Sequence, residues 1–256
     1  GIYKIRYGKE IIGICDEMVV LFYLLTHAIQ GSSTVLLLGE TGTGKDLFAR
    51  ALHFNRGNES WQDLEYKSRY HIVNLPSIPK ELIASELFRY VKGAFTGANT
   101  SGRVGAFQNA SNGTILLDEI GDMPIDAQTV LLRVLEDKKI KKLGDNKYID
   151  LEKTRIVVST NRDLPSLVYQ GRFREDLYHR LAQVPLCLPP LRERGEQDIE
   201  ALVSYFINST NNGQSVQISP EAMKFIKTLS FPGNVRTLEN LVKQAKTFGG
   251  GIITED

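Results

Sequence analysis

Short apolar runs that end in polar or glycine-rich loops recur along the first three quarters of the chain. Each run carries four or five residues without polar alternation, which is typical of strands buried on both faces of a sheet. The segments that we predict as strands are 35–38, 71–74, 114–118, 155–159 and 184–188. Helical patterns lie between them, for example at 46–54 and 125–137. Strands that alternate with helices predict an α/β fold with a parallel sheet.

The pattern changes after Pro189, where only helix signals follow. Two stretches, 198–207 and 234–247, carry apolar residues on one helical face. Between them, the serine–proline pair at 219–220 is typical of a helix start. We therefore predict two domains, an α/β domain over residues 1–189 and a small all-helical domain over residues 190–256.

No membrane segment is predicted. The longest apolar run, Met18–Leu25, has eight residues, whereas a spanning helix needs about 20. We interpret this run as a buried helix, and the N-terminus lacks a signal-peptide layout. The two cysteines, Cys15 and Cys187, form no C-x-x-C pair, which argues against a zinc knuckle or a disulfide scaffold. A reducing, cytoplasmic compartment is the expected location.

The composition is that of an ordinary folded protein, with 42% hydrophobic and 24% charged residues. The 31 basic and 30 acidic residues leave a net charge of +1. This balance argues against a chain whose main task is to coat nucleic acid or an anionic membrane.

A glycine-rich loop follows the first predicted strand and leads into a helix. Its sequence GETGTGKD fits the phosphate-loop pattern G-x-x-x-x-G-K, with Gly39, Glu40, Thr41, Gly42, Thr43, Gly44, Lys45 and Asp46. Glycines let main-chain N–H groups face an anion, and the helix N-terminus adds partial positive charge. Lys45 would then reach the terminal phosphates of a nucleotide. The alternative is an ordinary glycine turn. Asp46 stands where a magnesium-binding Ser or Thr is usual.

A second motif, TILLDE at 114–119, is an apolar strand that ends in two acids. Beside a phosphate loop it is typical of a Walker B element. Asp118 would hold magnesium through water, and Glu119 would polarise the attacking water. The alternative is a strand end followed by a turn, where acids are common.

The segment KGAFTGA at 92–98 resembles the signature loop of the bacterial enhancer-binding proteins, the AAA+ activators of sigma-54 RNA polymerase. Six further blocks resemble this family in order, at 39–46, 113–124, 159–164, 171–181, 188–194 and 231–240. The resemblance covers nearly the whole chain. It implies a P-loop NTPase of the AAA+ fold, with a parallel sheet flanked by helices and followed by a helical lid. In this family an acid normally follows the phosphate-loop lysine.

The resemblance also implies ATP hydrolysis with Mg²⁺ and a role for each matching residue. Glu119 would be the hydrolytic acid and Asp118 the magnesium residue. Asn74 would be the switch that holds Glu119 in an inactive pose. Asn161 would be the first sensor, facing the γ-phosphate, and Arg236 the second sensor, in the lid. For Arg236 the alternative is a solvated arginine at a helix start.

Arg174 and Arg180 resemble the arginine fingers that reach the nucleotide of a neighbouring subunit, while Ile12 and Gly13 would line the adenine. Arg174 and Arg180 are six positions apart, so one helix cannot present both on one face unless it ends between them. The alternative for Arg180 is an i,i+4 surface pair with Asp176.

The signature loop, at 93–98, carries Phe95 and Thr96 at its centre, between glycines that interrupt a helical pattern. The resemblance implies that both residues contact the sigma factor. The alternative is a Phe95 that only pins the loop to the protein core. Before the loop, Arg89-Tyr90 stands where the family usually has Gly-His.

The sequence thus predicts an ATPase that remodels sigma-54 RNA polymerase and assembles into a ring, a hexamer or a heptamer. DNA contact is expected only through a separate domain that this chain lacks. The alternative is a nucleotide-dependent AAA+ scaffold or anti-activator with weak hydrolysis, which the departures at Asp46 and Arg89-Tyr90 motivate. Another AAA+ machine, such as a helicase loader or an unfoldase, would not use the signature loop.

Overall fold

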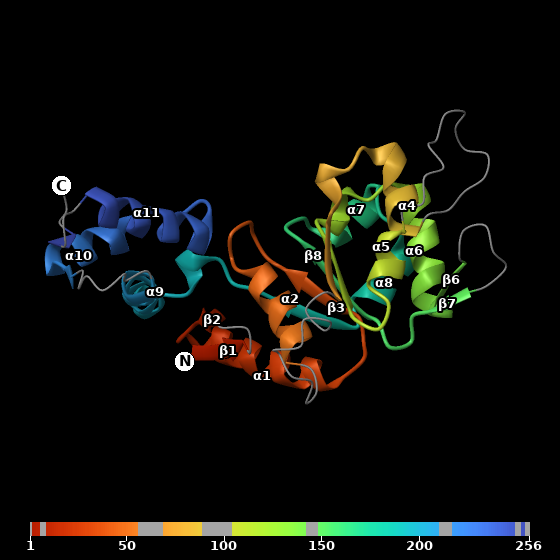
Figure 1. Cartoon of the computed structure of the whole chain (residues 1–256). Helices are drawn as coiled ribbons and strands as arrows, with labels where there is room; N and C mark the ends of the chain where they lie inside the picture. The colour runs from red at the N-terminus through yellow and green to blue at the C-terminus, as the bar shows by residue number, and fades with distance from the viewer. Residues whose placement is uncertain are drawn as a thin grey trace.

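A five-stranded parallel sheet forms the centre of the larger part of the protein (Figure 1). The computed structural model describes residues 2–5, 9–55, 69–88, 104–141, 148–209, 217–248 and 252–253. The strands lie in the order β4-β5-β8-β3-β9. Their bounds are β3 Val35–Leu38, β4 Tyr70–Asn74, β5 Thr114–Asp118, β8 Arg155–Thr160 and β9 Val184–Cys187. All five predicted strands are confirmed, and the parallel sheet with them.

Helices cover both faces of this sheet. Successive residues of β3 point to opposite faces, so Val35 and Leu37 pack in one apolar cluster and Leu36 in another. The first cluster includes α1 (Asp16–Gln30) and α2 (Lys45–Phe54). The helices of the second cluster are α4 (Lys80–Phe88), α5 (Ala106–Asn109), α6 (Ile125–Asp137), α7 (Leu164–Tyr169) and α8 (Glu175–Leu181). The result is a three-layer α/β structure.

The prediction of burial on both faces is right for the central strands and wrong for the edges. Every residue of β8 is buried, and so are the first four of β5. In β4, at one edge, Ile72 is 47% exposed. An edge strand has a neighbour on one side only, so part of its surface stays open.

The long apolar run Met18–Leu25 lies in α1, as predicted, but this helix is buried on one side only. Met18 and Leu25 are fully buried, whereas Val20 and Tyr23 are more than half exposed. In the described part of the chain, no helix is long and apolar enough to cross a membrane.

In the part of the C-terminal region that the structure describes, three helices lie together at one end of the molecule and form the lid (Figure 1). They are α9 (Glu196–Ser209), α10 (Pro220–Thr228) and α11 (Asn234–Phe248), and they share an apolar cluster. The predicted helix start is confirmed, since the Ser219 Oγ accepts a hydrogen bond from the Ala222 N–H at 3.0 Å. A short parallel pair of β10 (Gln217–Ile218) and β11 (Ile252–Ile253) was not predicted.

Several other short elements were not predicted from the sequence. They are the antiparallel pair β1 (Ile2–Ile5) and β2 (Lys9–Ile12), the antiparallel pair β6 (Lys139–Lys141) and β7 (Tyr148–Asp150), and the 3₁₀ turns η1 (Leu75–Ser77), η2 (Ile120–Asp122) and η3 (Leu191–Glu193). Of these, η3 matters most for the site, because it joins the sheet to the lid.

Candidate functional site

The carboxyl ends of four strands meet at one edge of the sheet. Leu38 of β3 lies opposite Thr160 of β8, and Asp118 of β5 lies between Ser159 and Asn74 of its neighbours. The predicted phosphate loop follows β3, Asn161 follows β8, and the two acids are the last residue of β5 and the residue after it. In open α/β sheets, ligands bind at this edge.

The phosphate loop turns through glycines in the left-handed region. Gly42 has φ 81° and Gly44, just before the first residue of α2, has φ 105°. A Cβ on Gly42 would also collide with the Gly233 carbonyl oxygen, which belongs to the lid. Glycine is therefore required at position 42 both by backbone conformation and by close contact.

Lys45 is a buried cation inside this loop. Only 9% of the residue is exposed, and its Nζ donates to the main-chain oxygens of Gly39 (2.6 Å) and Glu40 (3.2 Å). Burial lowers the pKa of its ammonium, Glu119 and Asp118 oppose that shift, and Arg236 adds to it. A partly desolvated ammonium in a ring of main-chain groups is suited to bind an incoming phosphate.

The two acids at the end of β5 have different partners. One oxygen of Asp118 accepts a hydrogen bond from Ser159 Oγ at 2.6 Å. Glu119 has left-handed φ and ψ of 59° and 55°, and its Oε2 accepts from the Asn161 N–H at 3.0 Å. Asn161 Nδ2 also donates to Thr41 Oγ1 at 3.1 Å. Strained non-glycine residues concentrate at functional sites, and here Asn161 links the strained acid to the phosphate loop.

Asn74 is an exposed residue at the end of β4, the strand beside Asp118. Its main-chain oxygen accepts from Ser77 Oγ at 2.6 Å. The hydrogen bond that Glu119 accepts comes from Asn161. The switch role of Asn74 stays a prediction.

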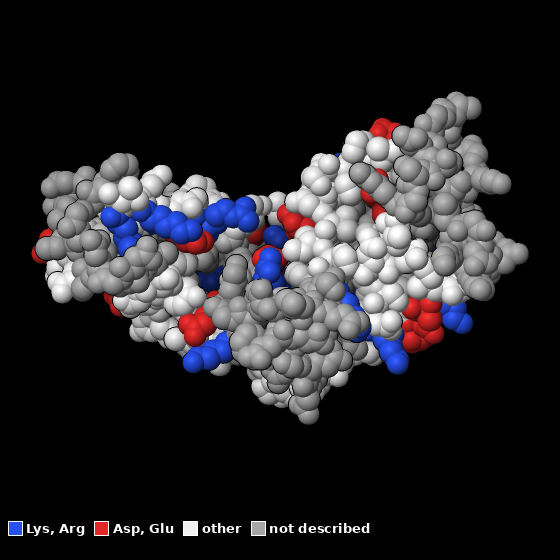
Figure 2. Space-filling model, in the orientation of Figure 1, with Lys and Arg blue, Asp and Glu red and all other residues white. Residues whose placement is uncertain are grey.

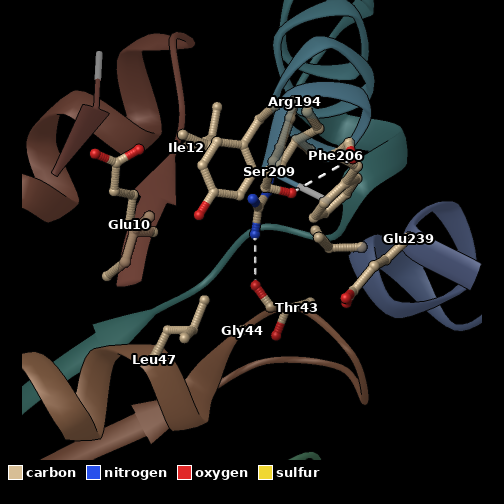
Figure 3. Close-up of a pocket in the computed structure, with 13 residues that line it drawn as sticks. Glu10, Ile12, Thr43, Gly44, Leu47, Arg194, Phe206, Ser209 and Glu239 are labelled. Atoms are coloured by element: carbon tan, nitrogen blue, oxygen red, sulfur yellow. Dashed lines mark hydrogen bonds between the residues drawn. The ribbon is translucent and has the colours of Figure 1, made fainter. Parts of the chain in front are cut away.

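A pocket of about 230 Å³ opens beside the phosphate loop (Figure 3). Its lining comes from β2, the loop, α2 and the lid helices, with Glu10, Ile11, Ile12, Thr43, Gly44, Leu47, Arg194, Leu202, Tyr205, Phe206, Ser209, Val235 and Glu239. Apolar and aromatic side chains with a few polar groups suit a flat ring system. Ile12 lines this pocket, and its contact with adenine stays a prediction. Beside it, a Cβ on Gly13 would come within 2.6 Å of Met18 Cβ, so this glycine lets α1 pack closely.

The sequence reasoning missed two buried charged residues, Arg194, which lines this pocket, and Asp198. Arg194 is 4% exposed and donates to the Thr43 carbonyl at 2.9 Å (Figure 3). Burial lowers the pKa of its guanidinium. Asp198, fully buried, accepts from the N–H groups of Ile14 (2.6 Å) and Cys15 (2.9 Å). Arg194 ends the block 188–194 and Asp198 follows it, but only the fold brings Arg194 to the phosphate loop and Asp198 to the start of α1.

Arg174 and Arg180 lie at opposite ends of helix α8. Arg174 is the N-cap residue, just outside the helix, and Arg180 lies in its last turn. Arg174 donates to both carboxylate oxygens of Asp176, at 3.0 and 2.6 Å, while Arg180 donates to the Leu135 carbonyl at 3.2 Å. The alternative pairing of Asp176 with Arg180 is therefore wrong. The finger roles stay predictions.

Asp46 and Arg236 are both exposed near the phosphate loop. The Asp46 carboxylate accepts from Arg50 Nε at 2.8 Å, one turn along α2. The Arg236 N–H donates to the Gly42 carbonyl at 3.3 Å, which places the start of α11 against the loop. Phe95 and Thr96, with the rest of the loop at 93–98, lie outside the described residues.

Asp118 and Glu119 are the carboxylates available to a metal at this edge. The described residues contain no group of three or more His, Cys, Asp or Glu side chains that could hold a metal ion by themselves. Mg²⁺ is usually held by one or two carboxylates together with waters and substrate phosphates. The donors therefore fit a magnesium ion that arrives with a nucleotide.

Comparison with known proteins agrees with this geometry. The family model described as the sigma-54 interaction domain matches residues 11–187, and the model of an AAA+ ATPase lid domain matches residues 192–255. The chain belongs to the sigma-54 interaction domain family. The predicted AAA+ fold and family are thereby confirmed, whereas the domain division at residue 189 stays a prediction.

Two relatives of this sigma-54 interaction domain are regulators by name. The DNA-binding transcriptional regulator NtrC of Rhizobium meliloti (strain 1021) is 44% identical over 93% of the chain and 47% of its own length. The regulatory protein AtoC of Escherichia coli (strain K12) is 43% identical over 88% of the chain and 48% of its own length. The chain thus spans about half the length of these relatives.

A solved structure has the same fold. NtrX from Brucella abortus in complex with ADP superposes with a TM-score of 0.78 at 32% identity, over 97% of this chain and 55% of that one. That structural relative holds ADP.

Proposed function

We propose that this chain is the ATP-hydrolysing motor that remodels sigma-54 RNA polymerase to activate transcription. One observation carries the proposal: the strained Glu119 is held by Asn161, which also bonds the phosphate loop. A general base, a polar sensor and a phosphate-binding lysine thus share one edge of the sheet. That combination suits attack of water on a terminal phosphate.

Each residue of the edge has a task in this reaction. Lys45 and the loop N–H groups bind the β- and γ-phosphates and keep them in place. Glu119 orients and polarises the water. Asn161 senses the γ-phosphate through its amide. Magnesium, when bound with the nucleotide by Asp118, neutralises charge on the phosphate oxygens.

The pocket beside the loop is the proposed adenine site. Ile12 and Leu47 supply apolar contacts, and Tyr205 and Phe206 supply ring faces. The pocket reaches Thr43 and Gly44, so a base seated there would have its phosphates over the loop. The substrate that fits both regions is ATP.

A nucleotide-dependent scaffold with weak hydrolysis is the second candidate. It is favoured by Asp46, which pairs with Arg50 and stands where a hydroxyl usually binds magnesium. A phosphate-release assay on concentrated protein separates the two. Steady ATP turnover, with sigma-54 binding when hydrolysis is trapped at its transition state, supports the motor. Nucleotide binding without turnover supports the scaffold.

The first prediction concerns assembly. If Arg174 and Arg180 complete the site of a neighbouring subunit, turnover per subunit rises with protein concentration. Arg174→Ala subunits mixed into wild-type protein should reduce turnover by more than their share, because each one disables a neighbour. Phosphate release across mixing ratios measures this. A linear loss in proportion to the mutant fraction would contradict fingers supplied between subunits.

The second prediction separates ATP turnover from sigma-54 binding. Thr96→Ala should leave ATP turnover unchanged and abolish sigma-54 binding, since the resemblance gives this hydroxyl a contact with the sigma factor and none with the nucleotide. Phe95→Ala should lose at least as much binding, because aromatic residues typically supply more interface energy than hydroxyl groups. Turnover, a sigma-54 pull-down and melting temperature are measured on the same proteins. A core-pinning Phe95 would instead lower the melting temperature, by an amount that matches about 3–5 kcal/mol.

A further inference from the structure

Main-chain carbonyl groups of the phosphate loop are hydrogen-bonded to the lid and to the segment before it. Three consecutive carbonyl groups of the loop each accept a hydrogen bond from α11 or from the segment that precedes the lid. The pairs are Thr41 with Asn234 Nδ2 (3.0 Å), Gly42 with the Arg236 N–H (3.3 Å) and Thr43 with Arg194 Nη2 (2.9 Å). Every main-chain oxygen from Thr41 to Thr43 therefore has a partner that does not belong to the loop.

Glu40 extends this contact with its side chain. Its carboxylate accepts two hydrogen bonds from Arg192, at 2.9 and 2.7 Å, and one from Asn234 Nδ2 at 3.1 Å. These bonds lower the pKa of Glu40 to about 2, which favours the charged carboxylate. Its main-chain oxygen accepts from Lys45 Nζ. Glu40 thus joins the lid to the phosphate-binding lysine.

The backbone conformation and the hydrogen bonds at position 234 both suit asparagine. It is fully buried and has a left-handed φ of 52°, which asparagine tolerates better than most residues. Its Oδ1 accepts from the Leu191 N–H at 2.8 Å while its Nδ2 donates to the loop. The preceding Gly233 touches Gly42 so closely that no side chain fits between them. In Figure 2, acidic and basic side chains meet at the junction between the lid and the rest of the protein.

We propose that Glu40, Arg192 and Asn234 are positioning residues that couple lid orientation to ATP affinity. A phosphate loop binds its anion through N–H groups, so its carbonyl groups point the other way and need separate partners. The docked lid and the segment that leads into it supply those partners. If the lid moves away, the loop carbonyl groups and Glu40 lose these hydrogen-bond partners at the same time. The loop conformation that binds phosphate is therefore stabilised by the docked position of the lid. This inference rests on the proposed nucleotide site.

ATP affinity tests the coupling in a double-mutant cycle. A fluorescent ATP analogue is titrated into the wild type, Glu40→Gln, Arg192→Gln and the double variant. Each single change should weaken binding by about 3- to 10-fold, since it breaks a charged hydrogen-bond pair that is partly exposed. The double variant should bind no more weakly than the weaker single variant, because both changes remove one shared interaction.

A matched control lies inside the lid. Lys227 pairs with Glu196 and Glu200 there, so Lys227→Gln removes a comparable ion pair and should leave the affinity unchanged. Hydrogen exchange adds a direct readout, since the Arg236 amide bonds the Gly42 carbonyl and should exchange faster in Glu40→Gln.

The outcomes are distinguishable. Weaker, non-additive binding with faster Arg236 exchange supports the coupling. Equal affinity in all four proteins, additive losses, or unchanged exchange at Arg236 would overturn it. A wild-type protein that binds no ATP analogue would contradict the proposed nucleotide site itself, and the coupling with it.

Discussion

Glu119→Gln should bind ATP like the wild type and hydrolyse it about 10²- to 10⁴-fold more slowly. The amide oxygen of glutamine can still accept the hydrogen bond from the Asn161 N–H, and the shape of the side chain is unchanged. What is lost is a carboxylate that can take up or polarise a proton. Phosphate release measures turnover, and a fluorescent nucleotide measures binding.

The matched control is Glu221→Gln, in the first turn of lid helix α10, where the side chain is exposed and far along the chain from the site. It should leave both turnover and binding unchanged. Normal turnover in Glu119→Gln would show that another group activates the water. Loss of nucleotide binding in that variant would show that Glu119 acts on the substrate itself.

The sheet could be predicted because burial leaves a pattern in the sequence. The central strand β8 is buried at every position, and the apolar residues Ile156, Val157 and Val158 at its centre mark it in the sequence. The edge strands β4 and β9 also carry short apolar runs, so the sequence predicts more burial for them than the structure has. The order of strands in the sheet, which creates those edges, comes from crossover connections that no local pattern encodes.

The site was predictable only in part, for a related reason. Lys45, Asp118 and Glu119 sit in short motifs whose spacing is set by local backbone geometry. The bond between Glu40 and Arg192 joins residues 152 positions apart and leaves no periodicity. The contacts of Arg194 and Asn234 with the phosphate loop were not predicted for the same reason. The resemblance supplied roles for single residues, whereas the lid contacts behind the loop appear only in three dimensions.

Lys45→Met should weaken ATP binding by about 100-fold, which corresponds to about 2.7 kcal/mol. Methionine keeps most of the apolar stem in the buried site and removes the charged group that would bind phosphate. Thermal shift gives the measurement, because a ligand at 100 times its dissociation constant stabilises the folded state by about 2.7 kcal/mol. For a protein of this size that is a rise of about 5–10 °C in the wild type. In Lys45→Met the same ATP concentration should give almost none.

The melting temperature without nucleotide distinguishes this loss from misfolding. Burial holds the pKa of Lys45 below its ordinary value, so the folded state binds this proton less tightly than the unfolded chain. The charged ammonium therefore costs stability at pH values below its folded pKa, and this cost fades above the unfolded one. At neutral pH, Lys45→Met removes the cost and should not lower the melting temperature. Lys246→Met is the control, since its Nζ also donates to a main-chain oxygen, of Ile207, within the lid. An ATP-induced shift retained by Lys45→Met and equal to that of the control would reject Lys45 as the phosphate-binding group.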